Sequence, residues 1–77
     1  MTEIIITSEY IKLDSFLKLC GEAGSGGMAK LMIADGLIAV NGEICLMRGK
    51  KLRPGDIVET ENGTYSVIGD DTIKNDN

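Results

Sequence analysis

The sequence predicts a small α+β domain, in which two short helices pack against a small, mostly antiparallel sheet of about five short strands. A run of β-branched residues at Glu3–Thr7 comes first, two stretches of helical period follow, and the rest is short apolar runs separated by turn signals. This order of strand, two helices and four short strands is that of an α+β domain. The 77 residues suffice for one domain with a thin core, expected at residues 1–70, before a frayed acidic tail at 71–77.

The first helix is predicted over Ile11–Cys20, because apolar side chains recur there at positions i, i+3, i+4 and i+7. These side chains are Leu13, Phe16, Leu17 and Cys20. Asp14 suits its start, where the helix dipole favours a negative charge, and Gly21 is a natural stop.

The second helix is predicted over Gly26–Asp35. Ser25 is a suitable N-cap, and Gly36 can take the left-handed conformation that ends a helix. The apolar stripe consists of Met28, Ala29, Met32 and Ile33. Both helices are too short to be stable alone, so they must pack on each other or on the sheet.

Two strands, Leu37–Val40 and Glu43–Leu46, flank Asn41-Gly42, which is a strong signal for a type I′ hairpin turn. A basic connection follows, and Pro54-Gly55 fits the central positions of a type II turn. The remaining expected elements are the strand Ile57–Thr60, a tight turn at Asn62-Gly63 and the strand Thr64–Ile68.

Composition argues against several classes of protein. No apolar run is long enough to cross a membrane, and no signal-peptide core follows the first residues, so we expect a cytoplasmic protein without a membrane partner. Two cysteines, Cys20 and Cys45, without any histidine make a zinc site or an activated nucleophile a poor interpretation. The acids are scattered and each has a local explanation. We therefore expect neither an enzyme nor a cofactor.

The charges are separated along the chain. The net charge is −4, yet four cations and no acid lie between Arg48 and Arg53, the other two being Lys50 and Lys51. A charge run is usually a solvated face, but the exclusion of acids here favours a site for a polyanion. Lys12 and Lys30 would join this site if the fold brings the helix starts near it.

Two further features leave their interpretation open. The loop Gly24–Lys30 is neither a Walker motif nor G-x-G-x-x-G, but its glycines and free N–H groups suit either an anion or a tight helix–helix connection. Tyr10 precedes the first helix and could stack on a base or seal the edge of the core. With so few aromatic residues, recognition should favour shape and phosphates.

These residues, in this order, resemble the RNA-binding domain named for the small-subunit ribosomal protein S-four, also called the αL motif. The matching residues are Lys12-Leu13-Asp14, Leu17, Ser25, Ala29, Ile33, Gly36, Ile38, Val40-Asn41-Gly42 and Gly55-Asp56. They span Ile11 to Glu59, most of the chain. Single pieces are unspecific, and the ordered set is fairly strong.

Within that family the chain is similar to small free-standing members of the YaaA and YbcJ type, through Phe16-Leu17-Lys18, Ser25–Lys30 and the basic stretch before Pro54. The resemblance implies binding to structured, ribosomal RNA through the two helix starts and the basic connection. The candidate RNA-binding residues are Lys12, Ser25, Gly26, Gly27, Lys30, Arg48, Lys50, Lys51 and Arg53. Many family members carry Arg directly after the serine of the second helix, where this chain has Gly26.

The leading hypothesis is a monomeric, non-catalytic RNA-binding module with a role in ribosome assembly or translation. A protein-interaction module of the same fold, with ribosomal or assembly proteins as partners, is the alternative. A β-grasp sulfur carrier fits poorly, because such carriers end in Gly-Gly and this chain ends Lys74-Asn75-Asp76-Asn77.

Overall fold

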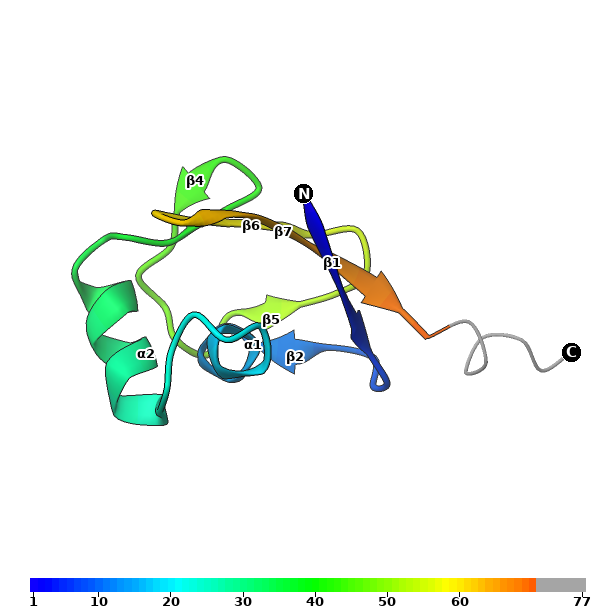
Figure 1. Ribbon diagram of the computed structural model, residues 1–77, viewed down its shortest axis with the longest axis horizontal. Helices are drawn as coiled ribbons and strands as arrows, with labels where there is room; N and C mark the ends of the chain where they lie inside the picture. Colours follow the sequence, from blue (N-terminus) through cyan, green and yellow to red (C-terminus); the bar gives the residue numbers. More distant parts are fainter. Residues whose placement is uncertain (71–77) are drawn as a thin grey trace, which may run out of the picture.

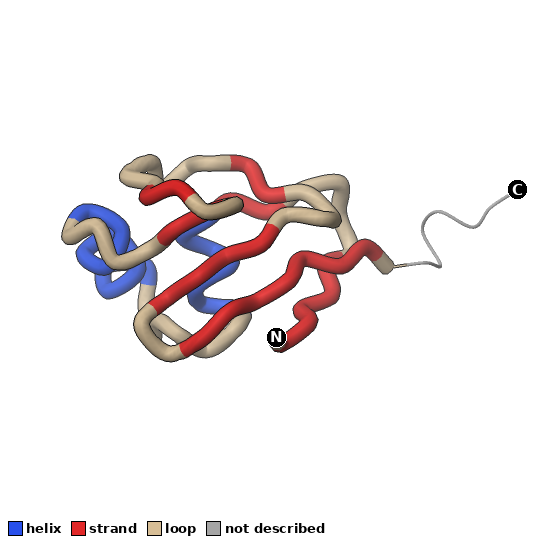
Figure 2. Tube along the Cα trace, turned by 90° about the horizontal axis from the view of Figure 1, so that it is seen from above, coloured by secondary structure: helices blue, strands red, loops and turns tan. Residues whose placement is uncertain are grey.

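The computed structural model describes residues 1–70, and the predicted acidic tail at 71–77 lies outside them. The predicted α+β class is confirmed. Figure 1 shows a sheet above a lower layer that holds both helices and a short two-stranded ribbon. Figure 2 shows from above that one helix lies beneath the sheet and the other at its left end. No helix within residues 1–70 is long and apolar enough to span a membrane.

The main sheet has five strands in the order β1-β7-β6-β3-β4. These strands are β1 (Thr2–Ile6), β3 (Ala39–Val40), β4 (Glu43–Ile44), β6 (Ile57–Thr60) and β7 (Gly63–Gly69). The neighbours are antiparallel except β1 and β7, which run parallel with Ile4 beside Val67. The predicted strands on either side of Asn41-Gly42 are present but shorter than expected.

Helices α1 (Leu13–Leu19) and α2 (Gly26–Ala34) form where two helical stretches were predicted. The Ser25 hydroxyl caps α2 by accepting the backbone N–H of Met28 at 3.1 Å, and Gly36 follows the helix at a φ of +75°. Ala29 and Ile33 are buried as the stripe predicted, but Met28 is half exposed. Met28 directly precedes the buried Ala29 and lies at the margin of the buried face of α2.

The predicted first helix is too long at its start. Residues Ile11–Lys12 form β2, which pairs antiparallel with β5 (Lys51–Leu52) to make the ribbon. Lys12 is extended, at φ −74° and ψ 149°, and α1 begins at the next residue. The basic connection therefore contains a strand, whose partner is almost 40 residues earlier in the chain.

The Asn41-Gly42 turn is held by more than its backbone. Both residues have positive φ, at 52° and 89°, as a type I′ turn requires. The Asn41 amide donates to the Asp56 carboxylate at 3.1 Å, and its carbonyl accepts the N–H of Ile57 at 2.9 Å. The Asp56 carboxylate also accepts the N–H of Arg53 at 2.8 Å, which closes the turn at Pro54-Gly55. One side-chain pair thus joins two turns.

The second hairpin turn is shifted by one residue from its prediction. Gly63 belongs to β7 and pairs with Thr60, so Glu61 and Asn62 form the loop. The Thr60 hydroxyl accepts the N–H of Asn62 at 3.0 Å and braces this loop.

The core lies between the sheet and the lower layer. Its largest fully buried side chains are Leu13, Phe16, Leu17, Ile33, Ile38, Leu52, Val58 and Val67. Phe16 meets Tyr65 of β7 edge-on, with the ring centroids 6.3 Å apart and the planes at 83°. Each described element except the short outer strand β4 contributes to this cluster, so helices, ribbon and sheet are stable only together.

A polar link fastens the loop between the helices to the second hairpin. The Tyr65 hydroxyl donates to the Glu22 carboxylate, which also accepts the side-chain amide of Asn62 at 3.0 Å. The hydrogen bond from Tyr65 lowers the pKa of Glu22, and the same bond raises the pKa of Tyr65 to about 12. Both shifts favour the state in which Glu22 is charged and Tyr65 is neutral.

This link predicts how stability depends on pH. The folded pKa of Glu22 is below its ordinary value of 4.5, so its contribution is present above that value and lost as pH falls through the folded pKa. The folded pKa of Tyr65 is raised from 10.0, so its contribution is lost as pH rises toward about 12. Urea unfolding followed by circular dichroism across pH should show both losses. Tyr65→Phe, which keeps the ring, should flatten the alkaline loss, and an unchanged profile would contradict the link.

Candidate nucleic-acid interface

The start of α1 is tied to the basic segment that follows β4. The backbone N–H of Leu13 donates to the carbonyl of Lys50 at 2.9 Å, and that of Asp14 donates to the carbonyl of Arg48 at 3.1 Å. The next N–H, of Ser15, donates to the Asp14 carboxylate at 2.7 Å. The first N–H groups of α1 are therefore not open to an external anion, but they fix where the basic segment runs.

The ribbon places three of the predicted cations on one exposed face. Lys12 lies directly opposite Lys51 in the antiparallel register, and Arg53 is two residues beyond Lys51 on the same face. Leu52, between them, is fully buried, so its neighbours in the strand point outward. Within residues 1–70 none of these three cations forms an ion pair with an acidic residue. Like charges directly opposite one another are destabilising, so this arrangement has a cost.

Tyr10 belongs to the same face. Its ring lies under the Lys51 ammonium, 4.8 Å from the ring centroid, and near the Arg53 guanidinium, 5.6 Å away. The interpretation of Tyr10 as a seal on the core is therefore incomplete, since its ring also contacts cations.

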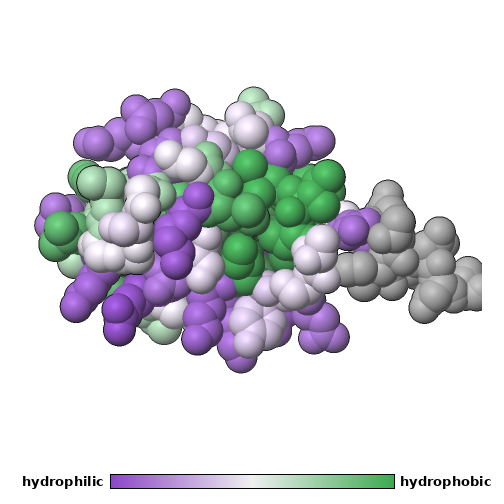
Figure 3. Space-filling model, turned by 60° about the horizontal axis from the view of Figure 1, so that its bottom comes forward, coloured by the Kyte–Doolittle hydropathy of each residue, from purple (hydrophilic) through white to green (hydrophobic). Residues whose placement is uncertain are grey.

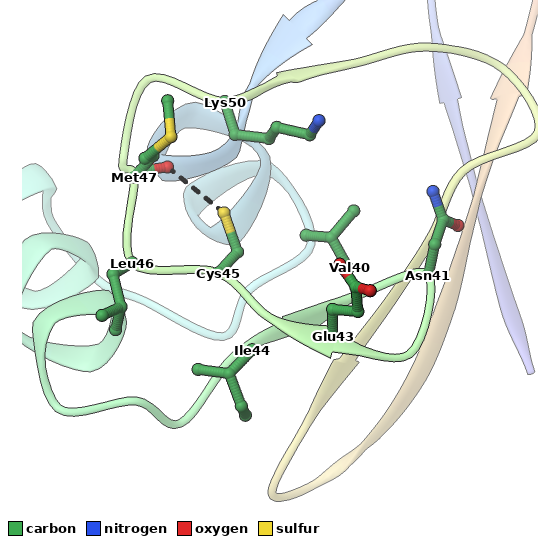
Figure 4. A pocket seen from close by; sticks show the side chains of 8 residues that line it. All are labelled: Val40, Asn41, Glu43, Ile44, Cys45, Leu46, Met47 and Lys50. Carbon is green, nitrogen blue, oxygen red and sulfur yellow. Dashed lines mark hydrogen bonds between the residues drawn. The ribbon is translucent and has the colours of Figure 1, made fainter.

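Lys50 points away from this face. It lines a hollow of about 470 Å³ beside the first hairpin, where Figure 4 shows its side chain reaching across toward Asn41. The hollow is lined by Val40, Asn41, Glu43, Ile44, Cys45, Leu46, Met47 and Lys50. Because neighbours in a strand point to opposite sides, the predicted basic patch is divided between the ribbon face and this hollow.

The start of α2 forms a second cluster. Ser25, Gly26 and Gly27 are exposed, and a Cβ added at Gly26 would find only the Lys18 ammonium, 4.0 Å away. Lys18 of α1 therefore lies beside the first turn of α2. Figure 1 places this start at the left end of the lower layer and the ribbon to the right of it. Lys30 is exposed, one turn further along α2.

Apolar surface accompanies these charged groups. Figure 3 brings the lower layer forward and shows a continuous hydrophobic patch, on the side nearest the C-terminal end and bordered by hydrophilic side chains. Apart from what this view shows, Ile44, Leu46 and Met47 of the β4–β5 segment are each more than 60% exposed. Contiguous exposed apolar residues are typical of surfaces that interact with a partner.

A comparison with known families decides the identity. Residues 4–68 match the family model of the S4 domain, which is most of the chain. The chain belongs to the S4-domain family. It is also 44% identical over 66 residues to a protein of Bacillus subtilis (strain 168) named as the probable ribosome maturation protein RlbA, a match that spans 84% of this chain and 93% of that protein.

In this S4 domain, all nine residues predicted for the site are exposed. The structure brings Lys12, Lys51 and Arg53 together on the ribbon, and it sets Ser25, Gly26 and Gly27 apart at the start of α2. Sequence reasoning did not select Lys18 for the site. The spacing of Lys18 from Gly26 gives no sign of their proximity, which depends on how α1 and α2 pack.

Possible metal ligands and the two thiols are the remaining reactive groups among residues 1–70 of this S4 domain. No group of three or more His, Cys, Asp or Glu side chains among residues 1–70 is arranged to hold a metal ion. Burial raises the pKa of the Cys20 thiol, which disfavours the reactive thiolate, and its Sγ donates to the carbonyl of Leu17 at 3.7 Å. Cys45 is half-buried in the hollow wall.

The ribbon of the S4 domain predicts a stabilising substitution. Lys12 faces Lys51 and also precedes α1, where the helix dipole disfavours a positive charge. Lys12→Gln should therefore raise the free energy of unfolding by about 0.5 to 1 kcal/mol, measured by urea denaturation at low salt.

High salt should remove most of that gain, because both effects are screened. Lys30→Gln, which removes an equal charge from the exposed face of α2, is the matched control and should change stability little. Equal stability of Lys12→Gln and wild type at low salt would show that the ribbon tolerates its charges without cost.

Proposed function

We propose that this S4 domain is a non-catalytic RNA-binding module that binds structured ribosomal RNA. The observation that carries the proposal is the ribbon face, where Lys12, Lys51 and Arg53 are exposed and unpaired by any acid within residues 1–70, in a chain of net charge −4. Binding to RNA depends largely on the neutralisation of phosphates by Lys and Arg. A phosphate backbone is therefore the ligand that turns a costly cluster of cations into a favourable one.

The start of α2 is the second point of binding. Its exposed glycines leave room for a phosphate close to backbone N–H groups, and Lys18 adds a positive charge there. Arg48, Lys50 and Lys30 supply further charge around the two clusters. The name of the Bacillus relative, a probable ribosome maturation protein, supports a role in ribosome assembly.

Neutral substitution of the basic segment should weaken RNA binding. Lys50→Gln/Lys51→Gln should lower affinity for a labelled ribosomal RNA fragment about ten-fold at low salt, in fluorescence-anisotropy titrations. The slope of log affinity against log salt should become less steep by roughly 0.7 to 0.9 for each phosphate that the protein no longer neutralises.

A matched control separates local binding from net charge. Thr2→Glu/Leu31→Glu lowers the net charge by the same two units at exposed positions away from the ribbon. This control should retain most of the affinity. If both double variants bind as tightly as wild type, Lys50 and Lys51 do not contribute to an RNA interface.

The start of α2 allows a gain-of-function test. A side chain at Gly26 meets no backbone, so Gly26→Arg, which restores the residue common in the family, should fold normally and tighten RNA binding several-fold. Gly27→Asp also fits, with only the Ser25 hydroxyl 3.9 Å from the new Cβ, and should weaken binding without loss of stability. Unchanged binding by both variants would leave the glycines with only a structural role.

A protein-interaction module of the same fold is favoured by the exposed row of Ile44, Leu46 and Met47. Affinity capture from cell extract, with and without nuclease, distinguishes the two functions. Partners lost after nuclease treatment support RNA binding, whereas ribosomal proteins that remain bound to wild type but not to Leu46→Ser/Met47→Ser support the second function.

A further inference from the structure

The outer face of the ribbon carries one aromatic ring among its cations. The antiparallel register pairs Ile11 with Leu52 and Lys12 with Lys51. Continued by one residue, it places Tyr10 opposite Arg53 and diagonal to Lys51. Residues two apart on a strand share a face, so all three side chains point to the same side as Lys12.

Two cationic side chains lie over the Tyr10 ring. The Lys51 ammonium lies 4.8 Å from the ring centroid and the Arg53 guanidinium 5.6 Å, both within the range of cation–π attraction. The loop before β2 is braced by the Ser8 hydroxyl, which donates to the carbonyl of Tyr10 at 2.7 Å. On the other side of the ribbon, the backbone N–H of Arg53 donates to the carboxylate of Asp56. The backbone that carries the ring and the backbone that carries Arg53 are thus both held by hydrogen bonds.

This arrangement changes the cost of binding. Free Lys and Arg side chains sample many rotamers, and a ligand that orders them removes that freedom. Two cations that already rest on the Tyr10 ring have lost much of this rotamer freedom before the ligand binds. This is the general basis of preorganised binding. The same two cations lie over the ring that a base would use for stacking.

We propose that Tyr10 is a positioning residue, which holds Lys51 and Arg53 ready to bind neighbouring phosphates of one RNA strand, and that it does not stack on a base. This inference rests on the proposed RNA-binding function and assigns a subsite within it. Arg53 directly follows β5 and is two residues from Lys51, about 6.6 Å along an extended chain, so each cation reaches its own phosphate. Binding at this point is consequently independent of RNA sequence.

The test is a double-mutant cycle on the folded full-length chain, with a fluorescein-labelled ribosomal RNA hairpin and anisotropy titrations at several salt concentrations. Tyr10→Leu should weaken binding about five-fold at low salt and make the salt slope less steep, whereas Tyr10→Phe, which keeps the ring, should bind as wild type does. In a Lys51→Gln/Arg53→Gln background, Tyr10→Leu should have no further effect, because the groups it positions are gone.

Other outcomes overturn the inference. A loss of affinity for Tyr10→Leu that is equal in both backgrounds, with the salt slope unchanged, would identify Tyr10 as a base-stacking residue. Undiminished affinity in both backgrounds would leave the ring without a role in binding. Wild-type binding by Lys50→Gln/Lys51→Gln would contradict the proposed function itself, which keeps the two failures distinct. Urea denaturation of each variant checks that it remains folded.

Discussion

Two backbone hydrogen bonds at the start of α1 organise the lower layer of the molecule. The N–H groups of Leu13 and Asp14 donate to carbonyls of the segment that leads into β5, so the helix is capped by a part of the chain that is distant in sequence. The same pairing aligns β5 with β2 and buries Leu52 against the helices. Because the caps are backbone groups, the side chains of this basic segment remain available. The structural requirement of one helix thus places the cations of the candidate interface.

The clustering of cations is costly for a domain with so small a core. A chain of this size buries a limited apolar surface, so its free energy of unfolding is small. Repulsion within a group of cations lowers that free energy by a notable fraction. Lys12 and Lys51 nevertheless face each other, and the acids are elsewhere. Two polar links stabilise the surrounding fold: Asn41 with Asp56 joins two turns, and Glu22 with Tyr65 joins the helix loop to the sheet.

The sequence allowed prediction of the elements whose signals are local. The Ser25 cap, the stop at Gly36 and the Asn41-Gly42 turn are each specified by one or two residues and their backbone preferences, and all are present. The ribbon was missed because two-residue strands carry no periodicity of their own and exist only through pairing between distant segments. For the same reason Ile11 and Lys12 were assigned to the helix. The candidate cations were identified from composition, but their division between ribbon and hollow, and the approach of Lys18 to Gly26, depend on tertiary packing.

The parallel pairing of β1 with β7 constrains the order in which the domain can be completed. In the sheet order β1 has no neighbour other than β7, which is more than 50 residues later in the chain. Closing so long a loop lowers the conformational entropy of the chain, and contacts between residues close in sequence do not offset this loss. During synthesis, the helices and the first hairpin can form as they leave the ribosome, but β1 must wait as an unpaired, β-branched segment until the final strand has emerged. The domain therefore matures only after nearly all of it has been translated, and its first strand is the segment most in need of protection in the interval.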